Sequence, residues 1–331
     1  VPKTRIVRWA ATLPVLLGFA AAAMGFWWLL GSNAYPEPRR VPGMDISPDL
    51  EIEKAEPVDL QGQFVAGEGV PGESDGLWPW FRGVDRDAVV PDPPPLAERW
   101  SESGPPVLWS VAMGEGYAGA AVRDGRVYVL DYDQQRGGDA LRCLSLEDGQ
   151  EIWRRWYEVP IKRNHGISRT VPAVTEEHVI TIGPKCHVLC VDAETGEFRW
   201  GLDMVDRYGT TVPAWYAGQC PLIDEGRLIL APTGPGALMV AVDLDTGESI
   251  WETPNPGRWK MSHASIAVLD SVERKTYVVT AADGHVAGVA SDTGELLWTA
   301  RPWNLRIPVA TPVDCGEGRL FCAGGYGVGT A

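Results

Sequence analysis

Basic residues are scarce in this sequence of 331 residues. There are 29 Lys and Arg against 44 Asp and Glu, which gives a formal net charge of −15. No cluster of Lys and Arg is interleaved with aromatic residues, although such a cluster is the electrostatic footprint of a nucleic-acid-binding protein. The sequence therefore excludes nucleic acid as the main partner.

Signatures of catalysis and metal binding are missing as well. The chain contains no Gly-x-Ser-x-Gly, phosphate-loop, His-Glu-x-x-His or dinucleotide-binding motif. Its six cysteines include no Cys-x-x-Cys pair and no two adjacent cysteines. We therefore predict no catalytic residue and no metal ligand, and we consider an enzyme the less favoured class.

The cysteines fit a structural role better than a redox role. Cys143 and Cys190 each lie ten residues before a tryptophan of the repeat described below, so we predict that both are buried on equivalent strands. Cys186 and Cys190 are four residues apart in an extended segment, which places their Cα atoms roughly 13 Å apart, too far for a disulfide. A disulfide framework or a structural metal is the alternative.

A repeated Gly-x-x-x-Trp pattern is the strongest feature that is present. The tryptophans lie 47, 51 and 47 residues apart, about the length of one four-stranded propeller blade. The structural repeat residues are Gly149 and Trp153, Gly196 and Trp200, Gly247 and Trp251, and Gly294 and Trp298. A large flat ring at one repeat position fills the gap between neighbouring sheets.

Each unit between these tryptophans shows short alternating strands and Gly/Asp turns, as in Ala120-Ala121-Val122, Asp124-Gly125 and Val127-Tyr128-Val129-Leu130. The predicted fold is all-β: a β-propeller of four-stranded blades, with four full units and half of a fifth. Such a number does not close an ordinary ring, so we expect a propeller domain over 77–331 that is truncated at its C-terminus, and 7–8 blades when complete. Trp109 lies 44 residues before Trp153, which indicates the outer strand of a further blade and ring closure.

Residues 1–76 predict a membrane anchor and a tether. Residues 9–31 are free of charge and long enough to span a bilayer of about 30 Å, and basic residues precede them. This predicts a short cytoplasmic N-terminus over 1–8 and a single transmembrane helix over 9–31, with a cleaved signal peptide as the alternative. Residues 32–76 are rich in Pro and acidic residues, so we expect a disordered linker.

The repeat carries a family resemblance. The copies at 192–200 and 243–251 closely resemble the tryptophan-docking repeat of the pyrroloquinoline-quinone (PQQ)-like β-propellers. Within that superfamily, Trp78 to Gly83 followed by Val107-Leu108-Trp109 looks like the membrane-anchored or secreted bacterial propellers similar to the BamB-type barrel-assembly lipoprotein. The likeness covers residues 77–331.

Two functions follow from this resemblance. A BamB-like chain would be a non-catalytic scaffold for protein–protein interaction, held in the bacterial inner membrane by residues 9–31 with the propeller in the periplasm and with envelope or membrane proteins as partners. The alternative is a quinoprotein dehydrogenase that oxidises an alcohol or sugar with PQQ and calcium. Such enzymes typically add an adjacent Cys-Cys pair and a calcium cage of carboxylates and amides, and neither is visible in this sequence. We therefore predict no cofactor for the scaffold.

A candidate binding site lies where the first strands of the blades begin, because these positions converge on one mouth of the channel. Arginine, aromatic residues and one histidine are typical of a surface that recognises an anionic group or a peptide. Ordinary loop residues satisfied by neighbouring backbone are the alternative. The candidates are Tyr117, Arg169, Trp215, Tyr216, Gln219, His263 and Arg306.

Overall fold

The computed structural model describes residues 18–27 and 57–331, except positions 91, 92, 94, 96, 103, 163–165, 271–273, 303, 305, 306, 326 and 328. The chain divides into two compact units, Val1–Pro48 and Asp49–Ala331. In the first unit, residues 18–27 form an exposed helix. The rest of the predicted span 9–31 lies outside the described residues, and within them no helix is both long and apolar enough to cross a membrane.

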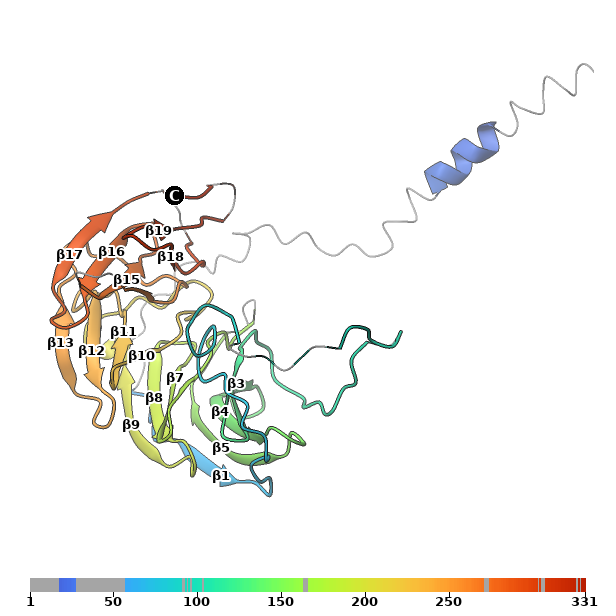
Figure 1. The fold of residues 1–331 in the computed structure, drawn as a ribbon, viewed down its shortest axis with the longest axis horizontal. Coiled ribbons are helices and arrows are strands. Elements are labelled where there is room, and N and C mark those ends of the chain that lie inside the picture. Colours follow the sequence, from blue (N-terminus) through green and yellow to red (C-terminus); the bar gives the residue numbers. More distant parts are fainter. Residues whose placement is uncertain are drawn as a thin grey trace, which may run out of the picture. The chain divides into compact units, whose positions relative to one another are not determined.

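The second unit consists of antiparallel sheets that follow one another in chain order (Figure 1). Blade 1 contains β1 (Gln63–Ala66), β2 (Ala120–Arg123), β3 (Arg126–Asp133), β4 (Gly138–Ser145) and β5 (Glu151–Glu158). Blade 2 contains β6 (Ala173–Val174), β7 (His178–Ile182), β8 (His187–Asp192) and β9 (Phe198–Asp203). A short helix, α2 (Met204–Tyr208), follows β9.

The later blades repeat this order. Blade 3 contains β10 (Leu222–Asp224), β11 (Arg227–Leu230), β12 (Met239–Asp243) and β13 (Ser249–Thr253). Blade 4 contains β14 (Ala267–Leu269), β15 (Thr276–Thr280), β16 (Val286–Ala290) and β17 (Leu296–Ala300), and a half blade contains β18 (Val313–Asp314) and β19 (Leu320–Phe321). The prediction of an all-β chain built from four-stranded units is confirmed.

The repeated Gly and Trp join one blade to the next. The Trp153 indole donates a hydrogen bond to the Glu194 carbonyl (3.0 Å), and its ring covers Gly196. Gly196 has φ of 70°, and a Cβ there would fall 2.6 Å from a ring atom of Trp153. Only glycine meets both demands, because it tolerates the left-handed conformation and leaves room for the ring. Trp200 packs on Gly247, and Trp251 on Gly294, in the same way.

Trp109 occupies the same kind of position in front of blade 1. Its indole donates to the Leu146 carbonyl (2.9 Å), and its ring lies against Gly149. Trp109 therefore docks as the repeat tryptophans do, but it is not part of a strand, and the closure of the ring stays a prediction.

The predicted burial of the repeat cysteines is also confirmed. Cys143 in β4 and Cys190 in β8 are fully buried on the third strand of their blades. Burial raises the pKa of each thiol to about 12, which makes it unreactive.

Residues 57–86 form a segment that we call the strap, and here the structure corrects the sequence analysis. We expected residues 32–76 to be disordered, yet β1 pairs antiparallel with β5 and makes blade 1 five-stranded. Phe64 in β1 lies under the Arg155 guanidinium, 5.4 Å from carbon to ring centroid. This segment has few apolar residues, but it is ordered because the open edge of β5 offers hydrogen-bond partners to its backbone. Amino-acid composition alone does not reveal such partners.

Beyond β1 the strap reaches the innermost strands of three blades. Trp78 forms a β-bridge with Val122 of β2, and the Pro79 carbonyl accepts a hydrogen bond from the Val174 backbone of β6 (2.8 Å). The Arg86 guanidinium donates to the Ile223 carbonyl of β10. The strap thus ties blades 1, 2 and 3 together at the end of their inner strands.

Candidate functional site

One face of the propeller carries all the predicted site residues that the structure describes. Because neighbouring strands run antiparallel, the segments that connect consecutive blades emerge on the same side as the turns between second and third strands. We call this side the loop face. The repeat turns, such as 146–150 and 193–197, lie on the opposite side, which we call the turn face.

Hydrogen bonds link the segments of the loop face from blade to blade. Each bond joins residues at or just before the innermost strand of one blade to the equivalent segment of the next. They run from the Tyr117 N–H to the Ser168 carbonyl (2.7 Å), from Val171 N–H to Cys220 Sγ (3.3 Å), from Cys220 N–H to Ser265 Oγ (3.0 Å) and from His263 N–H to the Pro308 carbonyl (3.2 Å). This chain of bonds gives the mouth a fixed geometry.

Tyr117 and Arg169 form the first half of the candidate site. The Tyr117 ring is 66% exposed and lies against Gly166, and the Arg169 guanidinium carbon is 5.7 Å from the ring centroid. Arg169 Nη2 also donates to the Gly166 carbonyl (3.0 Å). Burial lowers the pKa of Arg169, but a guanidinium remains charged at any physiological pH. The pair presents a positive charge beside an aromatic ring.

Trp215 and His263 form the second half. Their rings stack with centroids 5.9 Å apart and planes 23° apart. Burial, and then the positive charge of Arg169, lower the pKa of His263 to about 4. The imidazole is therefore neutral at neutral pH and too weakly basic for efficient general-base catalysis. It can instead donate or accept a hydrogen bond.

The other three predicted residues do not join this group. Tyr216 is buried at φ of 68° and donates its hydroxyl hydrogen bond to the Lys162 carbonyl (2.5 Å). Gln219 is buried, accepts from the Ala231 N–H (3.1 Å) and donates to the Ala264 carbonyl (3.4 Å). Both hold the loop backbone in place. Arg306 lies outside the described residues.

A second Trp–His stack on the loop face has no counterpart in the sequence analysis. Trp259 and His285 stack at 4.9 Å and 22°, and Asp283 Oδ1 lies 2.7 Å from His285 Nδ1. Asn255 fixes the Trp259 segment with hydrogen bonds to Trp259 N–H and carbonyl. Residues 255–259 have no repeat signature, so only the tertiary contact of this segment with the turn at 281–285, where the Ala282 N–H donates to the Lys260 carbonyl (2.9 Å), reveals the pair.

A buried polar group below the loop face was also missed. Tyr157 donates a hydrogen bond to Asp139 (3.0 Å), and its ring meets the His187 ring edge-on at 5.4 Å. His187 Nε2 lies 3.6 Å from Asp203, which accepts from two backbone N–H groups at the start of α2. Burial raises the pKa of Asp139 to about 7. The four side chains come from four strands, so no motif in the sequence joins them.

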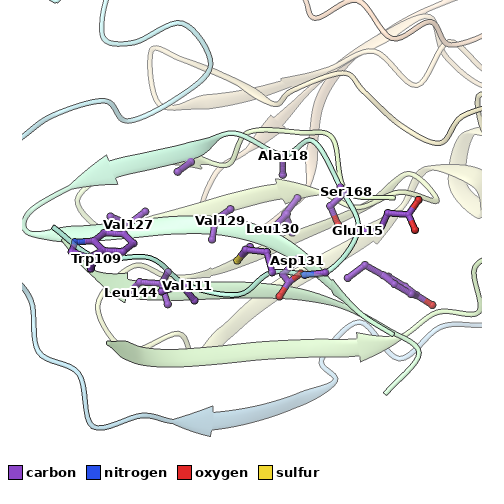
Figure 2. Close-up of a pocket in the computed structure, with 15 residues that line it drawn as sticks. Trp109, Val111, Glu115, Ala118, Val127, Val129, Leu130, Asp131, Leu144 and Ser168 are labelled. Atoms are coloured by element: carbon purple, nitrogen blue, oxygen red, sulfur yellow. The ribbon is translucent and has the colours of Figure 1, made fainter. Parts of the chain in front are cut away.

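One apolar pocket of about 330 Å³ lies on the face of blade 1 (Figure 2). Trp109 and Val111 cover Val127, Val129 and Leu144, and the acidic residues Glu115 and Asp131 lie at the other end. Arg142 is buried there and bonds to Asp131 and to Glu151. In blades 2, 3 and 4 the corresponding face of the sheet packs against the blade before it. In blade 1 the segment with Trp109 and Val111 covers this face, and the pocket lies beneath that segment.

One set of potential metal ligands occurs in the described part of the chain: Glu177, His178 and Asp245. His178 Nε2 lies 2.9 Å from Asp245 and also 2.9 Å from the Arg199 guanidinium. A guanidinium beside the ligand nitrogen already supplies the positive charge of this group. The residues present therefore fit an ionic contact between blades 2 and 3 better than a metal.

Comparison with known families now adds to the geometry. The family model for the outer membrane protein assembly factor BamB matches residues 88–202 and 136–329. The chain belongs to the BamB family. No curated protein matches it. The PQQ-like propeller predicted from the repeat is confirmed at the level of the family.

Solved structures similar to this BamB-family chain include a BamB protein and several dehydrogenases. BamB from Moraxella catarrhalis is 16% identical with a TM-score of 0.40, over 67% of this chain and 59% of that one. A quinohemoprotein alcohol dehydrogenase from Pseudomonas putida HK5 is 22% identical with a TM-score of 0.39, over 56% of this chain and 34% of that one. A europium-containing methanol dehydrogenase is 14% identical with a TM-score of 0.44, over 64% and 48%. The BamB-family chain thus spans 34–59% of the length of these proteins.

Proposed function

We propose that this chain is a non-catalytic scaffold that mediates protein–protein interaction in the bacterial cell envelope. In this proposal residues 9–31 anchor it in the inner membrane, the propeller lies in the periplasm, and the partners are envelope or membrane proteins. The BamB family assignment supports the proposal at the level of the fold, and the loop face supports it at the level of residues.

The observation that carries the proposal is the chemistry of the mouth. His263, the candidate base there, stacks on Trp215 and is influenced by Arg169, so its environment favours the neutral imidazole. Charge and aromatic surface at the centre of a fixed loop network suit recognition, because such residues dominate the energetics of interfaces.

The test is affinity capture of the full-length chain from detergent-solubilised envelopes of the native bacterium, with mass spectrometry of what is retained. We expect envelope proteins in constant ratio to the chain, and a turn-face variant should capture the same set. The same preparation should be mixed with PQQ and calcium and assayed for alcohol oxidation. Cofactor-dependent oxidation without any retained protein would contradict the scaffold and support the quinoprotein alternative.

A further inference from the structure

Charge is divided between the two faces of the propeller, which matters in a chain with a net charge of −15. The turn face carries exposed acidic pairs in each repeat turn, at 147–148, 194–197, 245–248 and 292–295. The loop face carries exposed or half-buried basic residues in the segments between blades 1 and 2, between blades 3 and 4 and after blade 4, and in the middle turn of blade 2. These are Lys162, Arg169, Lys185, Arg258, Lys260 and Arg301.

Four acidic residues of the loop face are engaged within the protein, while Glu158, Asp206 and Glu252 are exposed on it. Glu115 accepts a hydrogen bond from the Gly166 N–H (3.2 Å), and Asp133 is paired with Arg136. Asp203 caps α2, and Asp283 is hydrogen-bonded to His285. These four acidic side chains are held by contacts within the protein. On the turn face Arg274 pairs with Asp292 (2.8 Å) and Glu295 (3.3 Å), whereas the acidic residues at 147–148, 194–197 and 245–248 are exposed.

Arg169 and His263 lie on segments that both contact residues 215–220: Val171, two residues after Arg169, donates to Cys220 Sγ (3.3 Å), and His263 stacks on Trp215. The positive charge of Arg169 also acts on the imidazole. Two aromatic rings, Tyr117 and Trp215, flank them. A guanidinium gives a carboxylate both charge and hydrogen-bond donors, and a neutral imidazole can add one more donor. The rings offer flat surface to an apolar side chain beside that carboxylate.

We propose that the loop face binds an acidic, extended segment of a partner protein, and that Arg169 and His263 hold one carboxylate of that segment between Tyr117 and Trp215. This inference rests on the proposed scaffold function and names the surface and the chemistry of its partner. The acidic turn face repels the same segment, so the charge pattern also sets which face the partner approaches.

A labelled peptide tests the inference directly. The probe is a fluorescein-labelled octapeptide of alternating Glu and Phe, and the control probe has Gln in place of every Glu. Fluorescence anisotropy with the full-length chain should show binding of the Glu peptide and at least tenfold weaker binding of the Gln peptide. Raising NaCl from about 50 to 500 mM should weaken the Glu peptide only, since screening acts on the charged contact.

Substitutions at Arg169 and His263 test the location of the site. Arg169→Gln should weaken the Glu peptide about tenfold or more, whereas Arg274→Gln on the turn face should leave its affinity unchanged. His263→Gln keeps an N–H donor and should cost less affinity than His263→Ala. Circular dichroism spectra and melting temperatures of the variants identify any that fail to fold, and Arg169→Lys then serves as a second variant that keeps the charge and loses the paired donors.

Three results would overturn the inference: equal binding of the two peptides, wild-type affinity in Arg169→Gln, or binding to vesicles of anionic lipid with none to the Glu peptide. The scaffold proposal is tested separately by the capture experiment. If Arg169→Gln still captures the wild-type set of proteins, the scaffold stands and this site is wrong. If no form of the chain captures any protein, the scaffold itself fails.

Discussion

At the scale of single residues, Asp139 shows how burial decides chemistry. The carboxyl is 2% exposed, its Oδ1 has no hydrogen-bond partner within the described residues, and the nearby Asp131 adds negative charge. Tyr157 donates to the other carboxyl oxygen, Oδ2. The side chain therefore prefers the protonated form in the folded protein at a pH where an exposed aspartate is ionised.

This preference predicts a pH-dependent stability. The pKa of Asp139 is about 7 in the folded protein and near its ordinary 3.8 in the unfolded chain. Between these values the folded state binds the extra proton, so its contribution to stability is present at about pH 4 and is lost as pH rises to 7. The loss would be on the order of 2–4 kcal/mol from a shift of this size.

Asp139→Asn removes the titration while keeping an acceptor for Tyr157. Urea unfolding at pH 4.5 and 8 should show that the difference in free energy of unfolding between variant and wild type moves in favour of the variant as pH rises. A difference that is the same at both pH values would contradict the assignment.

At the scale of elements, the glycine of each repeat turn in blades 2, 3 and 4 is required by its contact with the docking tryptophan of the preceding blade. Gly196→Ala should place a Cβ against the Trp153 ring and strain a φ of 70°. We expect the free energy of unfolding to fall by roughly 2–4 kcal/mol, because the steric clash adds to a conformational cost of about 1 kcal/mol.

Gly226 provides a matched control. It has φ of 74° in the turn between β10 and β11, but nothing lies within 4 Å of the place a Cβ would take. The free energy of unfolding of Gly226→Ala should therefore fall only by the conformational cost, about 1 kcal/mol. Equal losses for the two variants in chemical denaturation would show that the tryptophan contact adds nothing.

The strap is the second feature at this scale. A Cβ on Gly67 would fall 1.9 Å from the Glu151 carbonyl oxygen, and the Gly67 N–H donates to the Ile152 carbonyl (2.8 Å). Gly67→Ala should detach β1 from β5 and leave an open strand edge. Hydrogen exchange of β5 amides should accelerate, while exchange in blade 3 stays unchanged. Gly104→Ala, with open space around its Cβ position, is the control, and unaltered β5 protection in Gly67→Ala would refute the account.

At the scale of the whole second unit, stability is distributed along the array of blades. The largest cluster of buried residues lies between blades 2 and 3, where Ile180, Val188, Leu228 and Val240 are fully buried. In the half blade, Val313 and Phe321 are 39% and 45% exposed. Each blade of such an array depends mainly on its neighbours.

Native-state hydrogen exchange should therefore be graded. Amides of β18 and β19 should exchange fastest, those of blades 2 and 3 slowest, and blade 4 should lie between them. Exchange at one common rate in all blades would indicate instead a single cooperative unit.

The sequence was informative where the physics is local. The Gly-x-x-x-Trp spacing determined the blade repeat, the tight turns and the buried third-strand cysteines, because each depends on residues close in the chain. It also located four of the seven proposed mouth residues in one group, since equivalent repeat positions must converge. The burial of Tyr216 and Gln219 could not be predicted, because their partners Lys162, Ala231 and Ala264 lie on other segments of the loop face, 12 or more residues away in the chain.

Tertiary structure alone decided the rest. The strap orders because an edge of blade 1 accepts it, and the Trp259–His285 stack and the Asp139 group form because distant segments meet. The charge division between loop face and turn face likewise depends on which ends of the strands lie together. In all these cases the free energy comes from partners far apart in sequence, so spacing and composition carry no record of them.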